Sequence, residues 1–375
     1  MSLEILNKVK NHKKFDKLDA LLVTKPENII YLLGFRIESD TTILMPSAAA
    51  KNLDQEIKIF LNVLEFDQIK KNIDSQPKFA EQFDLIRIPQ GEENYIEKQI
   101  KNMKMSQLGF EETYVNVNKF NKWKEKFDSL ELIGASEIIS DARILKTQKE
   151  VETMKKAAQL GITGFKAIYD NVEEGNTEKE LAALAEYEMR KAGADGTSFN
   201  TIVASGSRSA FPHALTSDKK IEKGDLIIVD IGAKLNGYCS DMTRTFIFEP
   251  GKSKNCEKKK ELINLVNDGQ KFGLENVNIG KKGSELDKMV RDYFKNEKEE
   301  WGDRFIHSLG HGVGIDIHED PYLTPISEDV LKEGMCVTVE PGLYIPELGG
   351  ARTEDLIVVK KEGFEILSDM EKFYY

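Results

Sequence analysis

A hairpin around Asn236-Gly237 constrains the fold of this chain more than any other stretch. Two apolar runs, LIIVDIGAKL and YCSDMTRTFIF, flank this dipeptide, which is the strongest short signal of a two-residue type I′ turn. The turn predicts a register that pairs Leu235 with Tyr238, Gly232 with Asp241, and Asp230 with Thr243. Because side chains alternate along a strand, Asp230 and Asp241 are expected on one face, roughly 7–8 Å apart.

Two interpretations of this acidic pair are open. The hairpin could lie on the surface with both aspartates solvated, or the aspartates could converge in a buried site. The run LIIV before Asp230 is typical of a buried strand and favours the second interpretation. A buried pair of carboxylates needs a cation, because unpaired charges are costly to remove from water.

Charge and composition exclude several classes of protein. Acidic residues outnumber basic ones, 64 to 53, and the net charge of −11 argues against binding to nucleic acid or an anionic membrane. No apolar run reaches the ~18 residues of a transmembrane helix, and the N-terminal stretch lacks the apolar core of a signal peptide. The three cysteines have no metal-type spacing and fit a reducing compartment, so a cytoplasmic location is predicted.

The 375 residues are enough for about two domains. In residues 1–135, short apolar runs (DALLVT, TTILM, IKIFLNV, FDLIRI) alternate with helical stretches, which predicts a smaller α/β domain with a mixed sheet. In residues 136–375, hairpin turns replace long crossovers, which predicts an α+β domain with an antiparallel sheet. Two capping boxes, Thr147 with Glu150 and Thr177 with Glu180, predict the starts of long helices there.

The second domain contains an internal echo. Residues 222–232 (EKGDLIIVDIG) match residues 332–342 (KEGMCVTVEPG) in pattern, at an offset of 340 − 230 = 110 residues. Each segment leads from a charged turn into an apolar strand that ends on a carboxylate, Asp230 or Glu340. Each is followed by another carboxylate, Asp241 or Glu354. Chance resemblance is one explanation; a duplication with an acidic site between its halves explains more of the residues.

Histidine and arginine residues cluster near these acids. Three of the five histidines lie in HSLGHGVGIDIHE, where glycines on both sides of His311 let the backbone approach a ligand closely. A lone histidine is usually a satisfied surface or core residue, but proximity to four acids favours a ligand. His213 follows Pro212 just before the first hairpin. Arg352 lies two residues before Glu354, on the same strand face, where a guanidinium can orient or neutralise a carboxylate.

Five segments in order resemble the pita-bread metallopeptidases, in the branch of Xaa-Pro aminopeptidases and Xaa-Pro dipeptidases (prolidases). The segments are ASGSRSAFPHA, VDIGAKLNGYCSDMTRTF, HSLGHGVGIDIHE, VTVEPGLYIP and GGARTEDLIVV, and PENIIYLLGF resembles the creatinase-like N-terminal domain of that branch. The resemblance implies a catalytic domain with an internal pseudo-two-fold duplication. It implies five ligands of a dinuclear metal centre: Asp230, Asp241, His311, Glu340 and Glu354. It also implies substrate-side or proton-handling roles for His213, His307 and His318, with Arg352 and Glu340 assisting.

The implied chemistry is hydrolysis of the bond before a proline. Four carboxylates and an imidazole suit two divalent ions, with manganese expected and cobalt, iron or zinc as alternatives. Two such ions balance four negative charges, and a water held between them loses a proton near neutral pH. A proline-containing peptide is the implied substrate, and a homodimer is implied by the family alone.

Three functions remain open. Where many prolidases place an arginine for the dipeptide's carboxylate, this chain has Tyr322, which favours an Xaa-Pro aminopeptidase over the dipeptidase alternative. The fold also includes non-catalytic binding proteins and the metal-free creatinase, which lack some of the five ligands.

Overall fold

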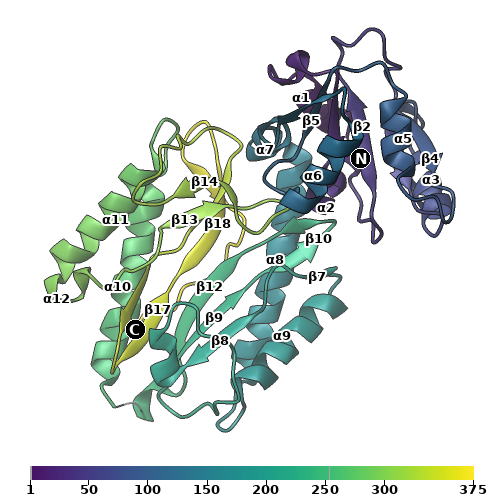
Figure 1. Cartoon of the computed structure of the whole chain (residues 1–375). Coiled ribbons are helices and arrows are strands. Elements are labelled where there is room, and N and C mark those ends of the chain that lie inside the picture. Colours follow the sequence, from purple (N-terminus) through teal and green to yellow (C-terminus); the bar gives the residue numbers. More distant parts are fainter. Residues whose placement is uncertain (1, 253) are drawn as a thin grey trace. The chain divides into compact units, whose positions relative to one another are not determined.

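The computed structural model describes residues 2–252 and 254–375 (Figure 1). The chain forms two compact units, Met1–Arg143 and Ile144–Tyr375. Among the described helices, none combines the length and the apolar character needed to cross a lipid bilayer.

The division between the units lies beyond the boundary expected near residue 135. Helix α7 (Glu137–Ile144) begins after that point, yet it is tied to the first unit. Tyr31 Oη donates to the carbonyl of Ala142 over 2.7 Å, and Arg143 Nη1 donates to Asn28 Oδ1 over 2.8 Å. These buried hydrogen bonds keep the end of α7 with the first unit, because leaving them unmade would cost about 1–3 kcal/mol each.

A six-stranded mixed sheet organises the first unit, in the order β4-β3-β2-β1-β5-β6. β2 runs antiparallel to β1 and β3, whereas the pairs β3–β4, β1–β5 and β5–β6 are parallel. This agrees with the α/β prediction. The strands are β1 (Ala20–Val23), β2 (Thr42–Pro46), β3 (Ile57–Leu61), β4 (Phe83–Arg87), β5 (Gln107–Phe110) and β6 (Glu131–Gly134). The remaining helices are α1 (Leu3–Lys10), η1 (Phe15–Lys17), α2 (Pro26–Leu33), α3 (Phe66–Asp74), α4 (Pro77–Ala80), α5 (Tyr95–Lys101) and α6 (Val117–Lys126).

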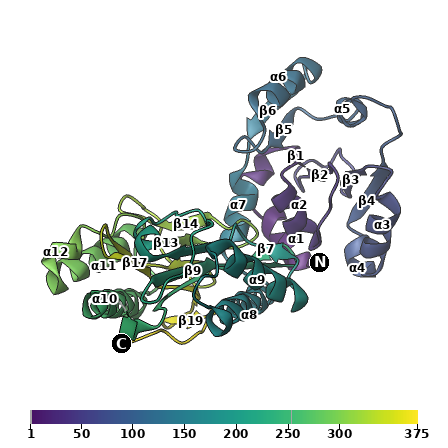
Figure 2. The same cartoon turned by 90° about the horizontal axis from the view of Figure 1, so that it is seen from below.

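The second unit is built on an antiparallel sheet in the order β14-β13-β15-β18-β12-β9-β8, with β19 beside β18. Figure 2 shows α8, α9 and α10 along one side of this sheet. The helices are α8 (Gln148–Asn171), α9 (Glu178–Lys191), η2 (Gly206–Ala210), η3 (Pro250–Lys252), α10 (Cys256–Glu275), α11 (Gly283–Glu297) and α12 (Glu299–Gly302). The strands are β7 (Gly196–Thr197), β8 (Ile202–Ser205), β9 (Leu226–Ile231), β10 (Ala233–Leu235), β11 (Tyr238–Cys239), β12 (Met242–Ile247), β13 (Gly310–Gly312), β14 (Glu319–Leu323), β15 (Cys336–Val339), β16 (Gly342–Ile345), β17 (Gly349–Arg352), β18 (Glu354–Val359) and β19 (Phe364–Ile366).

Two similar halves make up this unit, as the internal echo predicts. In the first half α8 and α9 precede the pair β9–β12, and in the second α10 and α11 precede the pair β15–β18. β9 and β15 begin 336 − 226 = 110 residues apart. Each half has its own apolar core, represented by Phe165 in the first and Phe294 in the second. Each such buried side chain contributes about 1.5–3 kcal/mol of transfer free energy.

Both predicted capping boxes are present at the starts of the two helices of the first half. Thr147 and Glu150 exchange hydrogen bonds at the start of α8, and Thr177 and Glu180 do so at the start of α9. These reciprocal bonds satisfy amide groups that the first helical turn would leave unpaired.

Candidate metal centre

The predicted hairpin forms and carries two of the acids. Asn236 and Gly237 have φ of +49° and +86°, the left-handed pair that a type I′ turn requires. The strands pair Leu235 with Tyr238 and Asp230 with Thr243, which confirms the register. Asp241 lies two residues before Thr243 and therefore shares the face of Asp230. The side chain of Asp241 is buried.

The central strand pair brings in the acids of the second half. β12 pairs with β18 so that Thr243 lies opposite Glu354. Asp230, Thr243 and Glu354 therefore form one row across three neighbouring strands. The hydroxyl of Thr243 donates to Glu354 Oε2 over 2.7 Å and orients it. Glu340 follows directly on β15, the other neighbour of β18.

His311 points a nitrogen lone pair at these acids. Its Nδ1 lies 3.1 Å from the carbonyl oxygen of Gly312, which can only accept a hydrogen bond, so Nδ1 carries the proton. Nε2 is then unprotonated, and it lies 3.7 Å from Asp241 Oδ2 and 3.3 Å from Glu340 Oε1. Burial, with a smaller contribution from His318, lowers the pKa of His311 to about 4 and keeps the ring neutral. Neutral imidazole is the form that binds metals.

The acids repel one another in a site largely removed from water. Burial and the charges of Glu354, Asp230 and Glu340 raise the pKa of Asp241 well above its usual range. Burial and the charges of Glu340 and Asp230 do the same to the pKa of Glu354. Burial raises the pKa of Glu340 to about 8. A cation among these groups would relieve both the repulsion and the burial cost.

Local geometry fits a cation as well as the charge does. Ligand atoms of Asp241, His311 and Glu354 all lie within 4.8 Å of one another. Asp230 Oδ1 is buried and has no hydrogen-bond partner among the described residues, although a buried carboxylate oxygen left unpaired is costly. Four carboxylates and one imidazole are a suitable donor set for divalent ions of intermediate hardness. The residues present therefore fit a divalent metal centre.

Arg352 connects the acids to a histidine. Its Nη2 donates to Asp230 Oδ2, and its Nη1 donates to the hydroxyl of Tyr344 over 2.8 Å. That hydroxyl lies 3.0 Å from His307 Nε2. His307 Nδ1 faces the carbonyl oxygen of Ser308 at 2.9 Å and so carries the proton, which makes Nε2 the acceptor for Tyr344. Burial, with Arg352 next, lowers the pKa of His307 to about 3, so this ring is neutral.

The two other predicted histidines are more accessible. His213 and His318 are both exposed, whereas His307 and His311 are partly buried. The ring of His318 lies edge-on to that of His311, with centroids 4.3 Å apart. His213 is close enough to His307 and His318 to depress the pKa of both, after the larger effect of burial. The structure thus brings all nine predicted site residues into one region of the second unit.

Sequence reasoning missed two hydroxyl residues in this region. Thr338 Oγ1 accepts a hydrogen bond from the amide of His311 at 3.0 Å and donates to Glu340 Oε1 at 3.1 Å, which couples two candidate ligands. Its place two residues before Glu340, on the same strand face, was the available signal. Tyr344 lies opposite Gly350 in the pair β16–β17, and no pattern in the sequence indicated its contact with Arg352.

Comparisons with known proteins agree with this arrangement. The sequence-family model of metallopeptidase family M24 matches residues 152–361, and the family model of the creatinase/prolidase N-terminal domain matches residues 6–145. The chain is 36% identical to a protein named Xaa-Pro dipeptidase of Pyrococcus furiosus, over 98% of this chain and 99% of that one. Among solved structures, an Xaa-Pro dipeptidase from Bacillus anthracis superposes with a TM-score of 0.88 at 33% identity, covering 99% of both chains.

A further solved structure, the X-Pro aminopeptidase from Thermotoga maritima MSB8, superposes with a TM-score of 0.85 at 31% identity, over 96% of this chain and 97% of that one. A family match over more than half of the chain, together with the buried acidic site, identifies the chemistry. The chain belongs to metallopeptidase family M24 and is a hydrolase that acts with divalent metal ions.

Proposed function

We propose that this chain hydrolyses the bond between any first residue and a following proline, with Xaa-Pro dipeptides as the main substrates. Its metal ligands would be the five residues grouped above: Asp230, Asp241, His311, Glu340 and Glu354. The observation that carries the proposal is the convergence of Asp241, His311 and Glu354, with a neutral imidazole aimed at acids whose pKa values are raised. Two divalent ions balance four carboxylates, and manganese suits so many oxygen donors.

When bound, the ions supply Lewis acidity toward water and toward the scissile carbonyl. The protein's own groups orient and move protons around them. Arg352 fixes one oxygen of Asp230 and leaves Oδ1 available to a cation. The hydroxyl of Thr243 likewise fixes one oxygen of Glu354, and the hydroxyl of Thr338 fixes one oxygen of Glu340. We also assign to Glu340 the role of taking a proton from water and returning it, because a carboxylate beside the reacting water can act first as base and then as acid.

The histidines divide into two groups by exposure. His213 and His318 are accessible, so we assign them to the substrate side, where they stabilise the tetrahedral intermediate or protonate the leaving nitrogen of proline. Both ring nitrogens of His307 have protein partners, and its part is to orient Tyr344 and, through it, Arg352.

The choice between dipeptides and longer peptides depends on two observations. Two relatives that match nearly the whole chain, from Pyrococcus furiosus and Pyrococcus horikoshii, are named Xaa-Pro dipeptidases, which supports the dipeptidase over the aminopeptidase expected from the sequence. Tyr322 favours the second candidate, an Xaa-Pro aminopeptidase. It lies opposite His311 in the pair β13–β14 and therefore shares its face, where a tyrosine offers no positive charge to a dipeptide's carboxylate.

Paired peptides test the proposal. An Xaa-Pro dipeptide and the matching Xaa-Pro-Xaa tripeptide are each assayed with manganese and with chelator, beside an Xaa-Ala dipeptide as control. We expect dipeptide cleavage that needs the metal, and little cleavage of the Xaa-Ala control. Faster cleavage of the tripeptide would replace the dipeptidase with the aminopeptidase, and full activity in chelator would reject the metal mechanism. The homodimer and the cytoplasmic location stay predictions.

A further inference from the structure

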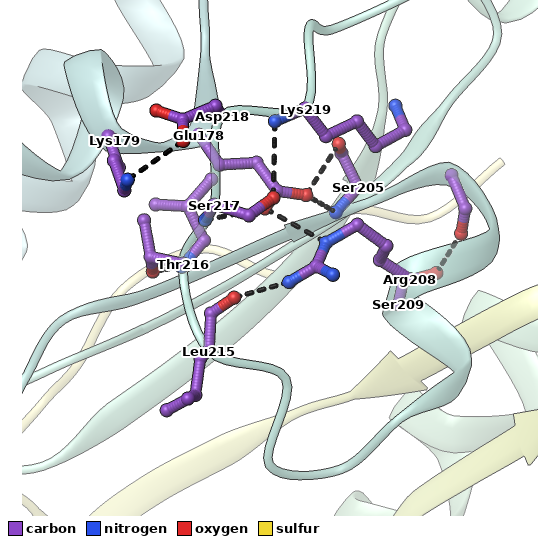
Figure 3. Close-up of polar contacts among 12 residues, drawn as sticks. Glu178, Lys179, Ser205, Arg208, Ser209, Leu215, Thr216, Ser217, Asp218 and Lys219 are labelled. Atoms are coloured by element: carbon purple, nitrogen blue, oxygen red, sulfur yellow. Dashed lines mark hydrogen bonds and ion pairs between the residues drawn. The ribbon is translucent and has the colours of Figure 1, made fainter.

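One buried carboxylate joins the two ends of the loop that carries His213, which runs from Ser205 to Ser217. Glu178 is the first residue of α9 and is fully buried. Its Oε1 accepts hydrogen bonds from Ser205 N and Ser205 Oγ, at 2.8 and 2.9 Å. Its Oε2 accepts from Ser217 N and Ser217 Oγ, at 3.0 and 2.7 Å. Figure 3 shows both serines reaching this side chain, Ser205 from the end of β8 and Ser217 from the far end of the loop.

A fifth donor comes from within the loop. Arg208 Nε donates to Glu178 Oε2 over 3.1 Å, and Arg208 Nη2 donates to the carbonyl of Leu215 (Figure 3). The arginine therefore links the first part of the loop to its last part while it neutralises the carboxylate. The amide of Lys179 adds a bond to the carbonyl of Ser217 at 3.1 Å.

The opposite side of the loop rests on the candidate metal centre. The carbonyl of Pro212, next to His213, accepts a hydrogen bond from Arg352 Nη1 at 3.2 Å. The amide of Gly350 donates to Ser209 Oγ over 3.0 Å. The loop is thus held on one side by Glu178 and on the other by β17, and His213 lies between these attachments in the sequence.

The chemistry of this contact requires a carboxylate. Both oxygens of Glu178 face donors, and a carboxylate is the side chain of this size that only accepts. A glutamine would place an amide NH₂ against the backbone N–H of either Ser205 or Ser217. Because two donors cannot pair, one end of the loop would be released while the size of the side chain stays the same.

We propose that Glu178 is a positioning residue for the hydrolytic reaction, because it closes this loop at both ends and so sets where the His213 imidazole stands relative to the scissile bond. The inference rests on the substrate-side role proposed for His213. Among the described residues, the Glu178 carboxylate bonds to Ser205, Arg208 and Ser217 and to none of the candidate ligands, so its effect on the reaction passes through the loop.

A double-mutant cycle tests the inference in the full-length, metal-loaded enzyme. Glu178→Gln is expected to lower kcat/KM about tenfold to a hundredfold, the usual range for a misplaced reacting group. His213→Ala is expected to lower it as well, and the double variant should match His213→Ala alone. Asp218→Asn is the matched control, because it removes only the exposed ion pair with Lys179 (Figure 3) and should leave kcat/KM unchanged.

The outcomes separate the two proposals. If His213→Ala keeps full activity, the role of His213 is wrong and the inference falls with it. If His213→Ala loses activity but Glu178→Gln does not, or if the two losses multiply, the inference alone is overturned. Should Glu178→Gln fail to fold, Arg208→Ala replaces it in the cycle, since this side chain is partly exposed. A loss of about threefold to tenfold that disappears in the His213→Ala background supports the inference, and an independent loss refutes it.

Discussion

The two halves of the second unit differ in what packs beside the first residue of an equivalent helix, α9 in the first half and α11 in the second. A backbone bridge joins Thr177 to Lys220 just before α9, and another joins Lys282 to Val330 just before α11. The partners Lys220 and Val330 are 330 − 220 = 110 residues apart, as β9 and β15 are. The first residues of the two helices therefore occupy equivalent places. That residue is Glu178 in the first half and Gly283 in the second.

A side chain fills the space beside the start of α9, whereas backbone fills the space beside the start of α11. In the first half the Glu178 side chain fills it and reaches Ser217. In the second half the chain itself fills it, since a Cβ on Gly283 would lie 2.3 Å from the carbonyl oxygen of Tyr322 and 3.1 Å from Ser327 Oγ. Ser217 and Ser327 are again 327 − 217 = 110 residues apart. The loop of His213 is thus placed by a side chain, and the strand of Tyr322 by direct backbone packing.

The halves also supply different ligands, and the largest expected effect tests whether both are needed. Asp241→Asn removes a charge from the first half, and Glu354→Gln removes one from the second. Each should lower kcat/KM by far more than the roughly 10–100-fold typical of changes behind the ligands, and each should lose bound metal. The folded state should persist, because each change relieves repulsion among acids whose pKa values are raised.

Steady-state kinetics with a metal count per chain measures this. His12→Ala, in the first unit, is the control and should keep both activity and metal. Wild-type activity in either ligand variant would mean that one half suffices, and the two-metal model would then be wrong.

Much of this arrangement follows from local sequence. Asn236-Gly237 fixes a turn whose geometry determines which residues face each other, so the position of Asp241 relative to Asp230 was predictable. The echo between residues 222–232 and 332–342 likewise predicted two strands ending on acids. These signals work because short-range backbone geometry carries them.

Contacts between distant segments were not predictable in this way. Glu178 reads in the sequence as one more acid in the first turn of a helix, a position where acids are common on exposed surfaces. Its burial depends on Ser205, Arg208 and Ser217, which only the folded chain brings to it. The hydrogen bond from Arg352 to Tyr344 depends in the same way on how β16 and β17 pack.

A substitution at the first residue of α11 tests whether the second half depends on close backbone packing there. Gly283→Ala places a methyl group against the backbone carbonyl of Tyr322, which cannot move aside as a flexible side chain could. Overpacking of this kind costs about 3 kcal/mol of unfolding free energy. Urea unfolding measures the loss, with Gly251→Ala as control, because nothing lies within 4 Å of a Cβ there. Equal stability of the two variants would show that the second half has room for a methyl group at this point.

The smallest expected effect concerns how each half contributes to stability without metal. Burial raises the pKa of Glu340 to about 8 in the folded chain, against the ordinary carboxyl value of 4.5, so between these values the folded, metal-free chain holds a proton that the unfolded chain has released. Stability must therefore fall as pH rises through this window. One proton corresponds to about 1.4 kcal/mol per pH unit, which predicts a loss of about 2 kcal/mol between pH 6 and pH 8. Asp241 and Glu354 act in the same direction.

Thermal melting of chelated protein across this pH range tests the slope, beside the manganese-loaded protein, whose ligands are ionised throughout and whose stability should change less. Glu340→Gln should flatten the slope of the chelated protein, because the neutral amide cannot release a proton. Asp241→Asn should also reduce it, and the ratio of the two reductions tells which half holds the proton. A chelated protein that grows more stable from pH 6 to pH 8 would contradict the raised pKa of Glu340, and with it the repulsion that makes this site select a cation.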